Sequence, residues 1–340
     1  MYAWRTDTGY TQIETPHPGV LHDRFRGLPS RCEVLVQVLA SSVNPADQYA
    51  TTGTMGSDLS GRVVSMGDGC NNSRLSVGAS VWGDIGAVTY TLNGNEKTKE
   101  NGAYAEYAVA LDSQLGWKPK NVDFQEAAAL PKVSLTSYKA LVWYANATNW
   151  TRSISGPVVL ILGGSGGTGS TGIQLAKALG AAEIITTTSS ANFDYCAELG
   201  ADRLIDYKAV NWWEELKEGS VDIVYDTVGQ QGTGDRALKV LRSSEYFGSY
   251  VTIAGALPTV SKPGISSNMF INSDTNLDSA ALLEELTLLG EKGQLRMPSI
   301  QQKYRLDEVA AAFKESSTGT VKGKLVIDIE NSTVTGTRVN

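Results

Sequence analysis

The stretch ILGGSGGTGS, residues 161–170, places five glycines in ten positions directly behind the apolar run 158–160. Glycine suits positions where the backbone turns sharply or where a ligand must approach it closely. The glycines recur at every third position between an expected strand and an expected helix, a spacing typical of dinucleotide binding, in which backbone amides and the helix N-terminus hold a pyrophosphate. A P-loop for ATP is disfavoured because Ser170 replaces the lysine, and a tight turn without ligand is the remaining alternative. The candidate contacts are Gly163, Ser165, Gly166, Gly167, Thr168 and Gly169.

The type of dinucleotide is read about 20 residues further on, at the end of the next expected strand, where NAD-binding proteins carry an acidic residue for the ribose diol. Here the strand ends in three hydroxyl side chains at 188–190, and the nearest acid downstream is Asp194. Hydroxyls accommodate a 2′-phosphate that a carboxylate would repel, so we expect NADPH rather than NADH. The alternative is that the hydroxyls only cap the following helix. The candidate contacts are Thr188, Ser189, Ser190, Tyr207 and Lys177.

Metal ligands are scarce in this sequence. The chain has three cysteines, Cys32, Cys70 and Cys196, which are far apart, and two histidines. This spacing predicts neither a disulfide framework nor a Cys-x-x-Cys metal pair. Since zinc prefers nitrogen and sulfur ligands, we expect no metal site.

Composition excludes several classes of partner. The 340 residues carry a formal net charge of −7, which argues against nucleic acid or an anionic membrane as a partner. No apolar stretch reaches the roughly 20 residues that span a bilayer, and the first residues do not form a secretory or transit signal. We therefore expect a cytoplasmic protein, or an organellar one if a leader is absent from this chain.

Two domains are expected to position these residues. Within 127–275, short apolar strands alternate with helical segments, the pattern of a doubly wound parallel sheet. Residues 1–126 contain short alternating runs punctuated by turn residues, as in an antiparallel barrel-like domain, and 276–340 are expected to return and complete it. A short strand at 267–274 would leave an exposed edge, so we expect a homodimer through it.

Eight stretches resemble the zinc-independent branch of the medium-chain dehydrogenase/reductase superfamily, which includes quinone oxidoreductases, zeta-crystallin, the mitochondrial reticulon-interacting oxidoreductase and plant enone and alkenal reductases. They run in family order over nearly the whole chain. The matching stretches are VNPADQY (43–49), GSDLSG (56–61), GAYAEYAV (102–109), AAALPKVSLTSYKAL (127–141), LGGSGGTG (162–169), LGADRLIDY (199–207), VYDTVG (224–229) and GKLVI (323–327). The resemblance implies an α/β fold with a Rossmann NADP-binding domain at 127–275 and a GroES-like β-barrel-type catalytic domain from 1–126 and 276–340.

The resemblance also implies the nicotinamide side of the site. Asn44 and Ser57-Asp58 stand where zinc-bearing relatives have ligands, so the metal is expected to be absent. The implied nicotinamide contacts are Asn44, Thr136, Val228, Gly229, Ile253, Gly255 and Lys324. Tyr49 matches a tyrosine that faces the substrate in several relatives, so Tyr49 and Asn44 are the candidate catalytic residues; a packing role for Tyr49 is the alternative.

The implied reaction is hydride transfer from NADPH to a conjugated carbonyl, either a quinone or the double bond of an enone or alkenal. Without a Lewis acid alcohol oxidation is disfavoured, whereas an enolate can be stabilised by hydrogen bonds. The alternative is an NADPH-binding structural or regulatory protein. The chain is shorter than relatives between Tyr49 and Gly56 and longer at 83–101, which we expect to be a surface loop or lid. The resemblance therefore does not decide which of these acceptors is the substrate.

Overall fold

The computed structural model describes most of the chain. The described residues are 1–16, 32–49, 53–71, 73–86, 90–92, 95–97, 102–147, 156–243, 248–270 and 279–332. The chain forms two compact units, the first from 1–132, 273–291 and 299–340 and the second from 133–272 and 292–298. The expected domain boundaries lay at 126/127 and 275/276. No helix within the described ranges is long and apolar enough to cross a membrane.

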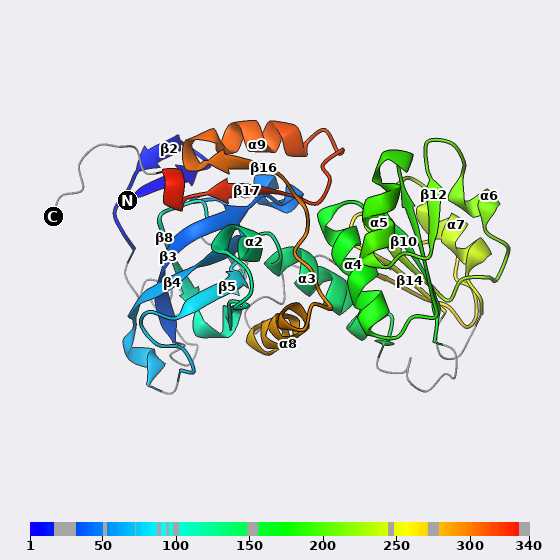
Figure 1. Ribbon diagram of the computed structural model, residues 1–340, viewed down its shortest axis with the longest axis horizontal. Coiled ribbons are helices and arrows are strands. Elements are labelled where there is room, and N and C mark those ends of the chain that lie inside the picture. Colours follow the sequence, from blue (N-terminus) through cyan, green and yellow to red (C-terminus); the bar gives the residue numbers. More distant parts are fainter. Residues whose placement is uncertain are drawn as a thin grey trace. The chain divides into compact units, whose positions relative to one another are not determined.

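Unit 1 contains a seven-stranded sheet in which the two ends of the chain meet. Its strands are β3 (Glu33–Ser42), β4 (Asp58–Met66), β5 (Ser80–Asp84), β8 (Tyr107–Leu111), β9 (Leu115–Trp117), β16 (Ile300–Arg305) and β17 (Lys324–Asp328). Their order is β16-β17-β3-β4-β5-β9, with β8 also paired to β3. Strand β17 runs antiparallel to β3, opposing Val326 to Ser42. The tail of the chain thereby supplies two strands to the N-terminal sheet (Figure 1).

Shorter elements complete unit 1. They are β1 (Tyr2–Arg5), β2 (Gly9–Gln12), β6 (Tyr90–Leu92), β7 (Asn95–Lys97), α2 (Phe124–Ala128), α8 (Ala280–Glu291) and α9 (Val309–Ser316). Strands β6 and β7 pair antiparallel inside the segment 83–101, which we expected to be a surface loop or lid.

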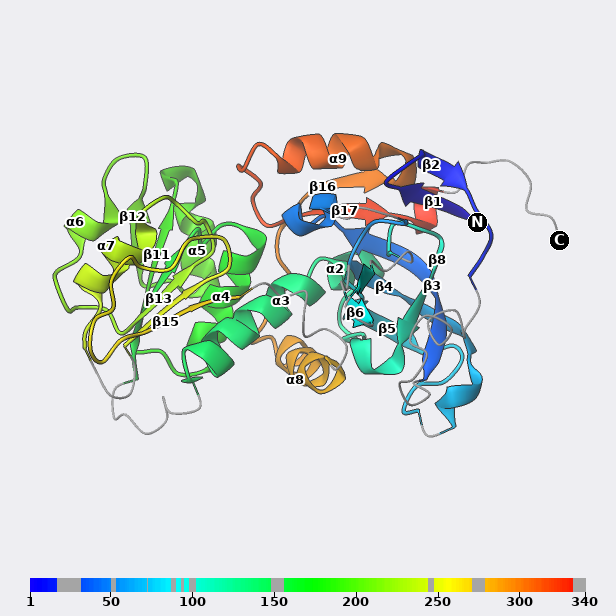
Figure 2. The same ribbon diagram turned by 180° about the vertical axis from the view of Figure 1, so that it is seen from behind.

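Unit 2 is a doubly wound α/β sheet, as predicted. Its six parallel strands are β10 (Val158–Leu162), β11 (Glu183–Thr188), β12 (Arg203–Asp206), β13 (Ile223–Asp226), β14 (Ser249–Thr252) and β15 (Ser266–Met269). Its helical segments include α3 (Pro131–Tyr138), α4 (Gly167–Ala178), α5 (Phe193–Leu199), α6 (Trp212–Glu215) and α7 (Thr233–Val240). Helix α4 contacts α5 and α6 contacts α7, and the two pairs flank the sheet (Figures 1 and 2). Strands covered on both faces read as continuous apolar runs, as in VVLIL of β10.

The strand order creates a switch point in this sheet. The order is β12-β11-β10-β13-β14-β15, so the chain proceeds from β10 to one edge and returns to β13 to build towards the other. The carboxyl ends of β10 and β13 are therefore adjacent while the connections that follow them diverge. In open α/β sheets this crevice is where ligands bind.

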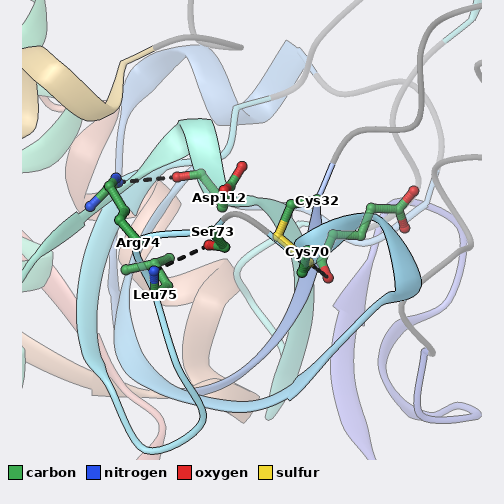
Figure 3. Close-up of a disulfide and its surroundings, with 7 residues drawn as sticks. Cys32, Cys70, Ser73, Arg74, Leu75 and Asp112 are labelled. Carbon is green, nitrogen blue, oxygen red and sulfur yellow. Dashed lines mark hydrogen bonds between the residues drawn. A yellow bond between two sulfur atoms is a disulfide. The ribbon is translucent and has the colours of Figure 1, made fainter.

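One expectation is wrong: Cys32 and Cys70 form a disulfide, with an S–S distance of 2.10 Å (Figure 3). The bond joins the residue before β3 to a short helical turn that follows β4. Beyond that turn, the Arg74 guanidinium donates to the Asp112 carbonyl at 3.2 Å, and the Asp112 amide donates to the Cys32 carbonyl at 3.0 Å. Cys196, in unit 2, is buried and outside the disulfide.

Candidate cofactor and active site

The glycines in the loop after β10 have different structural roles. Gly163 adopts φ +84°, a left-handed conformation that suits glycine. A Cβ on Gly169 would lie 2.1 Å from the Gly163 carbonyl oxygen, so the helix start packs directly on the loop. A Cβ on Gly166 would meet only the same oxygen at 3.5 Å. The second glycine is therefore the one with space beside it, which is where the fingerprint lets a pyrophosphate approach.

The start of α4 offers amides to an anion. Gly166 is the N-cap residue of α4 and supplies no side-chain cap, and Gly167 and Thr168 follow it in the first turn. The first amides of a helix have no partner within the helix and carry its positive dipole end. The loop itself is anchored to β11, because the Gly163 amide donates to Thr187 Oγ1 at 3.1 Å. These features suit a pyrophosphate held by backbone.

The end of β11 holds the predicted hydroxyls. Thr188 is 1% exposed, and its Oγ1 has no hydrogen-bond partner among the described residues. Ser189 is half-buried and Ser190 exposed. A buried hydroxyl without a partner costs free energy, so an orphaned Thr188 Oγ1 fits a place that a ligand completes.

An acid that sequence reasoning missed lies beside these hydroxyls. Strand β12 pairs with β11 so that Asp206 opposes Thr188. The Lys208 amide, at 2.9 Å, and Ser190 donate to Asp206 and hold the pKa of its carboxyl below the usual value. Tyr207 follows, 56% exposed, with its amide donating to the Thr188 carbonyl. The ribose end of the candidate site therefore combines hydroxyls with one carboxylate.

Lys177 does not belong to this site. It lies in the last turn of α4, ten residues from the start of the helix, a rise of about 15 Å. Its side chain packs on Gly200, the residue that ends α5 before β12 begins. Thr188 stands at the opposite, carboxyl end of the sheet, so the expected contact of Lys177 with a 2′-phosphate is wrong.

Three segments meet at the carboxyl ends of β10, β13 and β14. A Cβ on Gly163 would lie 2.8 Å from Val228 Cγ2, and one on Gly229 would lie 2.3 Å from the Ala254 carbonyl oxygen. The amide of Ile253 donates to the Asp226 carbonyl oxygen at 3.2 Å. The structure thus brings the glycine loop, 228–229 and 253–255 together at the switch point.

Thr136 joins this group through its helix. It is buried on α3, and its neighbour Ser137 donates from Oγ to the Thr168 carbonyl oxygen at 2.9 Å. Ser137 Oγ also lies 3.0 Å from Thr171 Oγ1. The carboxyl half of α3 is therefore fastened to the first turn of α4, beside the glycine loop.

In unit 1, Asn44 lies at the centre of a buried polar cluster. Its Nδ2 donates to Asp58 Oδ2 at 2.7 Å and to Ser57 Oγ at 3.3 Å, and its Oδ1 accepts from Lys324 Nζ at 2.7 Å. Lys324 also donates to the Val43 carbonyl at 2.8 Å. Asn44 and Lys324 were both predicted from distant parts of the sequence, and the structure joins them. Both amide protons of Asn44 are engaged within the cluster, so its side chain stabilises the cluster.

The electrostatics of this cluster are governed by burial. Burial raises the pKa of the Asp58 carboxyl to about 6; Asp84 adds to the rise, while Lys324 and Lys132 oppose it. Burial also lowers the pKa of the Lys324 ammonium, which the carboxylates of Asp58 and Asp47 partly offset. Asp58 and Lys324 lie 3.6 Å apart. A carboxyl that titrates near neutrality is therefore built next to Asn44.

A second ion pair borders the cluster and was not predicted. Lys132 Nζ lies 2.9 Å from Asp84 Oδ2, and the Lys132 amide donates to Asp58 Oδ1 at 2.7 Å. Burial acts to lower the pKa of Lys132, but the carboxylates of Asp84, Asp47 and Asp58 outweigh it and raise the pKa. Asp47 accepts from Tyr104 Oη at 2.8 Å, from Ser57 Oγ at 2.5 Å and from the Asn44 amide at 3.0 Å.

The remaining catalytic candidate is Tyr49. It ends a short 3₁₀ helix, Pro45–Tyr49, that follows Asn44 directly. The side chain of Tyr49 lies outside the described part of the structure, so its role stays a prediction. Among the described residues, no group of three or more His, Cys, Asp or Glu side chains is arranged to hold a metal ion.

Comparison with known proteins points to one family. Residues 30–120 match the family "Alcohol dehydrogenase GroES-like domain", and residues 199–327 match "Zinc-binding dehydrogenase". A 2-methylene-furan-3-one reductase of Solanum lycopersicum is 34% identical over 87% of this chain and 71% of that protein. An NADPH-dependent alkenal/one oxidoreductase of Arabidopsis thaliana, described as chloroplastic, is 31% identical over 87% and 72%. The quinone oxidoreductase of Coxiella burnetii has a similar structure, with a TM-score of 0.73 and 25% identity over 97% and 99%.

Proposed function

The chain belongs to the quinone oxidoreductase-like branch of the medium-chain dehydrogenase/reductase superfamily, and we propose that it uses NADPH to reduce a conjugated carbonyl compound. The oxidoreductase class and a nicotinamide cofactor follow from the family. A quinone, or the double bond of an enone or alkenal, as acceptor is the proposal.

The glycine loop carries this proposal. It stands at the switch point with space beside Gly166, uncapped amides at Gly167 and Thr168, and an orphaned hydroxyl on Thr188 at the end of the next strand. These residues would hold the pyrophosphate and adenosine parts of the cofactor, and the backbone at 228–229 and 253–255 would hold the nicotinamide part. When bound, NADPH supplies a hydride.

The protein's own contribution to the reaction is orientation and hydrogen bonding. Tyr49 is the candidate donor towards the acceptor oxygen, and the cluster around Asn44 fixes the backbone that leads to it. If Tyr49 donates, Tyr49→Phe should lower kcat by roughly 10- to 1000-fold with nearly unchanged cofactor affinity. An unaltered kcat would assign Tyr49 to packing.

The experiment that tests the function is NADPH consumption, followed by absorbance, with a panel of quinones, enones and alkenals. We expect turnover with at least one of these classes and no loss after chelation, since no metal is proposed to take part. Binding of NADPH without oxidation by any acceptor would instead support a structural or regulatory NADPH-binding protein.

The preference for NADPH over NADH needs its own test. Thr188, Ser189 and Tyr207 offer hydroxyls, whereas Asp206 engages Ser190 and places a negative charge near the expected 2′-phosphate. Fluorescence titration should show tighter binding of NADPH, and Asp206→Asn should increase that preference by roughly 2- to 5-fold, as expected for a partly exposed charge. Equal or tighter binding of NADH by the unmodified protein would contradict the NADPH proposal.

We also propose a homodimer through β15. This strand pairs only with β14 among the described strands, so its outer edge lies at the end of the sheet. Met269 on it is 55% exposed. Unpaired strand edges favour pairing with a symmetry mate. Light scattering at micromolar concentration should give twice the chain mass, and a monomer mass would refute the proposal.

A further inference from the structure

A buried carboxylate lies between the two loops assigned to the nicotinamide part of the cofactor. Asp226 ends β13 and is fully buried. Its Oδ1 accepts from the amides of Val228 and Gly229, both at 2.9 Å. Its Oδ2 accepts from Tyr250 Oη at 3.0 Å and Thr252 Oγ1 at 3.3 Å. Asp226 takes part in no ion pair found among the described residues.

The same hydrogen bonds continue into the second loop. Thr252 Oγ1 accepts from the Gly255 amide at 2.7 Å and from the Ala254 amide at 3.3 Å while donating to Asp226. A Cβ on Gly255 would lie only 2.7 Å from Asp226 Oδ2. One carboxylate thus anchors the loop after β13 directly and the loop after β14 through Thr252.

This anchoring fixes the direction of backbone carbonyls. In a trans peptide the carbonyl points opposite to the amide. Because the amides of Val228 and Gly229 point at Asp226, the carbonyls of Thr227 and Val228 point away from it, and the inward amide of Ala254 turns the Ile253 carbonyl outward in the same way. These outward carbonyls are acceptors suited to an amide donor such as a carboxamide.

We propose that Asp226, with Tyr250 and Thr252, is a positioning residue that holds both loops for the nicotinamide part of the cofactor and so controls hydride transfer. The carboxylate itself is buried beneath the loops and touches neither substrate nor cofactor. This inference rests on the proposed function, because it assigns the two loops to the nicotinamide.

Asp226→Asn tests the proposal with little change of shape. The Asn carbonyl can still accept from the Val228 and Gly229 amides, but its amide group would face the hydroxyl donors of Tyr250 and Thr252. Asp222→Asn is the matched control: Asp222 precedes the same strand, is 2% exposed, and accepts from the Val158 amide and Arg242, at the opposite end of the strand. Both variants lose a buried carboxylate, but only Asp226→Asn disturbs the hydrogen bonds that hold the two loops.

Three measurements separate positioning from general structure. Single-turnover hydride transfer should fall roughly 10- to 100-fold in Asp226→Asn, as expected for hydrogen bonds to a buried charge. NADPH should bind more weakly, while 2′,5′-ADP, which lacks the nicotinamide part, should bind within 2-fold of the unmodified protein. The kinetic isotope effect on turnover, measured with NADPH deuterated at the transferred position, should rise. Asp222→Asn should lower stability and leave all three readouts within 2-fold.

The proposal is overturned if Asp226→Asn transfers hydride within 2-fold of the unmodified protein, or if NADPH and 2′,5′-ADP lose affinity equally. If Asp226→Asn does not fold, Tyr250→Phe removes a single hydrogen bond to Asp226 and should give the same selective pattern, at roughly 3- to 10-fold. If none of the tested acceptors causes the unmodified protein to oxidise NADPH, the proposed function fails. The comparison of NADPH with 2′,5′-ADP still decides the role of Asp226.

Discussion

Loss of the Cys32–Cys70 bond should lower the free energy of unfolding of unit 1 substantially. The two cysteines are 38 positions apart, and closing a loop of that length restricts the unfolded chain by about 4 kcal/mol at 25 °C in the chain-entropy estimate. Cys32 is contiguous with β3, which pairs with β4, β8 and β17. The loss therefore acts on the strand around which the whole sheet of unit 1 is assembled.

Urea unfolding of Cys70→Ser measures this effect. A loss of about 4 kcal/mol corresponds to a midpoint lowered by about 1–4 M for urea slopes of about 1–3 kcal/mol per M. Cys196→Ser is the matched control, because it removes the cysteine outside the disulfide. Reductant should lower the midpoint of the unmodified protein and of Cys196→Ser but leave Cys70→Ser unchanged. Three titratable thiols in the unreduced, denatured protein, or a midpoint insensitive to reductant, would refute the reasoning.

Two further predictions follow from the site. Gly166→Ala should cost unit 2 only about 1 kcal/mol, the usual cost of alanine at an N-cap, and yet weaken NADPH binding, because the added methyl occupies the space beside the loop. Gly169→Ala should destabilise the fold by more, because its methyl would meet the Gly163 carbonyl; thermal unfolding and cofactor titration distinguish the two variants. The folded-state pKa of Asp58, about 6, lies above the ordinary 3.8, so its protonated form favours folding. The contribution of Asp58 to the stability of unit 1 should decline by up to about 3 kcal/mol as pH rises from about 4 to 6, and Asp58→Asn should make the pH slope shallower in urea titrations.

The features that are predicted best are those that depend only on residues close together in the sequence. The glycine loop, the strand before it and the helix after it are local, and the structure places them as predicted, with Gly163 in the required left-handed turn. The doubly wound sheet follows in the same way, because each strand and helix carries its own apolar pattern. The disulfide was missed because a separation of 38 residues says nothing of distance once β3 and β4 have folded side by side.

The site residues that were missed lie across strands. Asp206 opposes Thr188 only because β12 pairs with β11 in one register, which the sequence does not state. Asp226 stands inside a stretch that identified the family, but its four hydrogen bonds come from two separate segments, the loop after β13 and strand β14. Lys177 shows the reverse error, because the rise of an α-helix already places it far from the glycine loop.

The order of the strands in unit 1 has a consequence for protein synthesis. Strand β3 leaves the ribosome early, but its partner β17 follows about 280 residues later, after nearly all of unit 2 has emerged. At roughly 5–20 residues per second, the apolar residues of β3 wait about 15 to 60 s for that neighbour. Unit 2 can assemble during this interval from a nearly continuous segment. The strands of unit 1 that are translated before unit 2 are therefore completed after it, and they are the part most exposed to chaperones and to aggregation in the meantime.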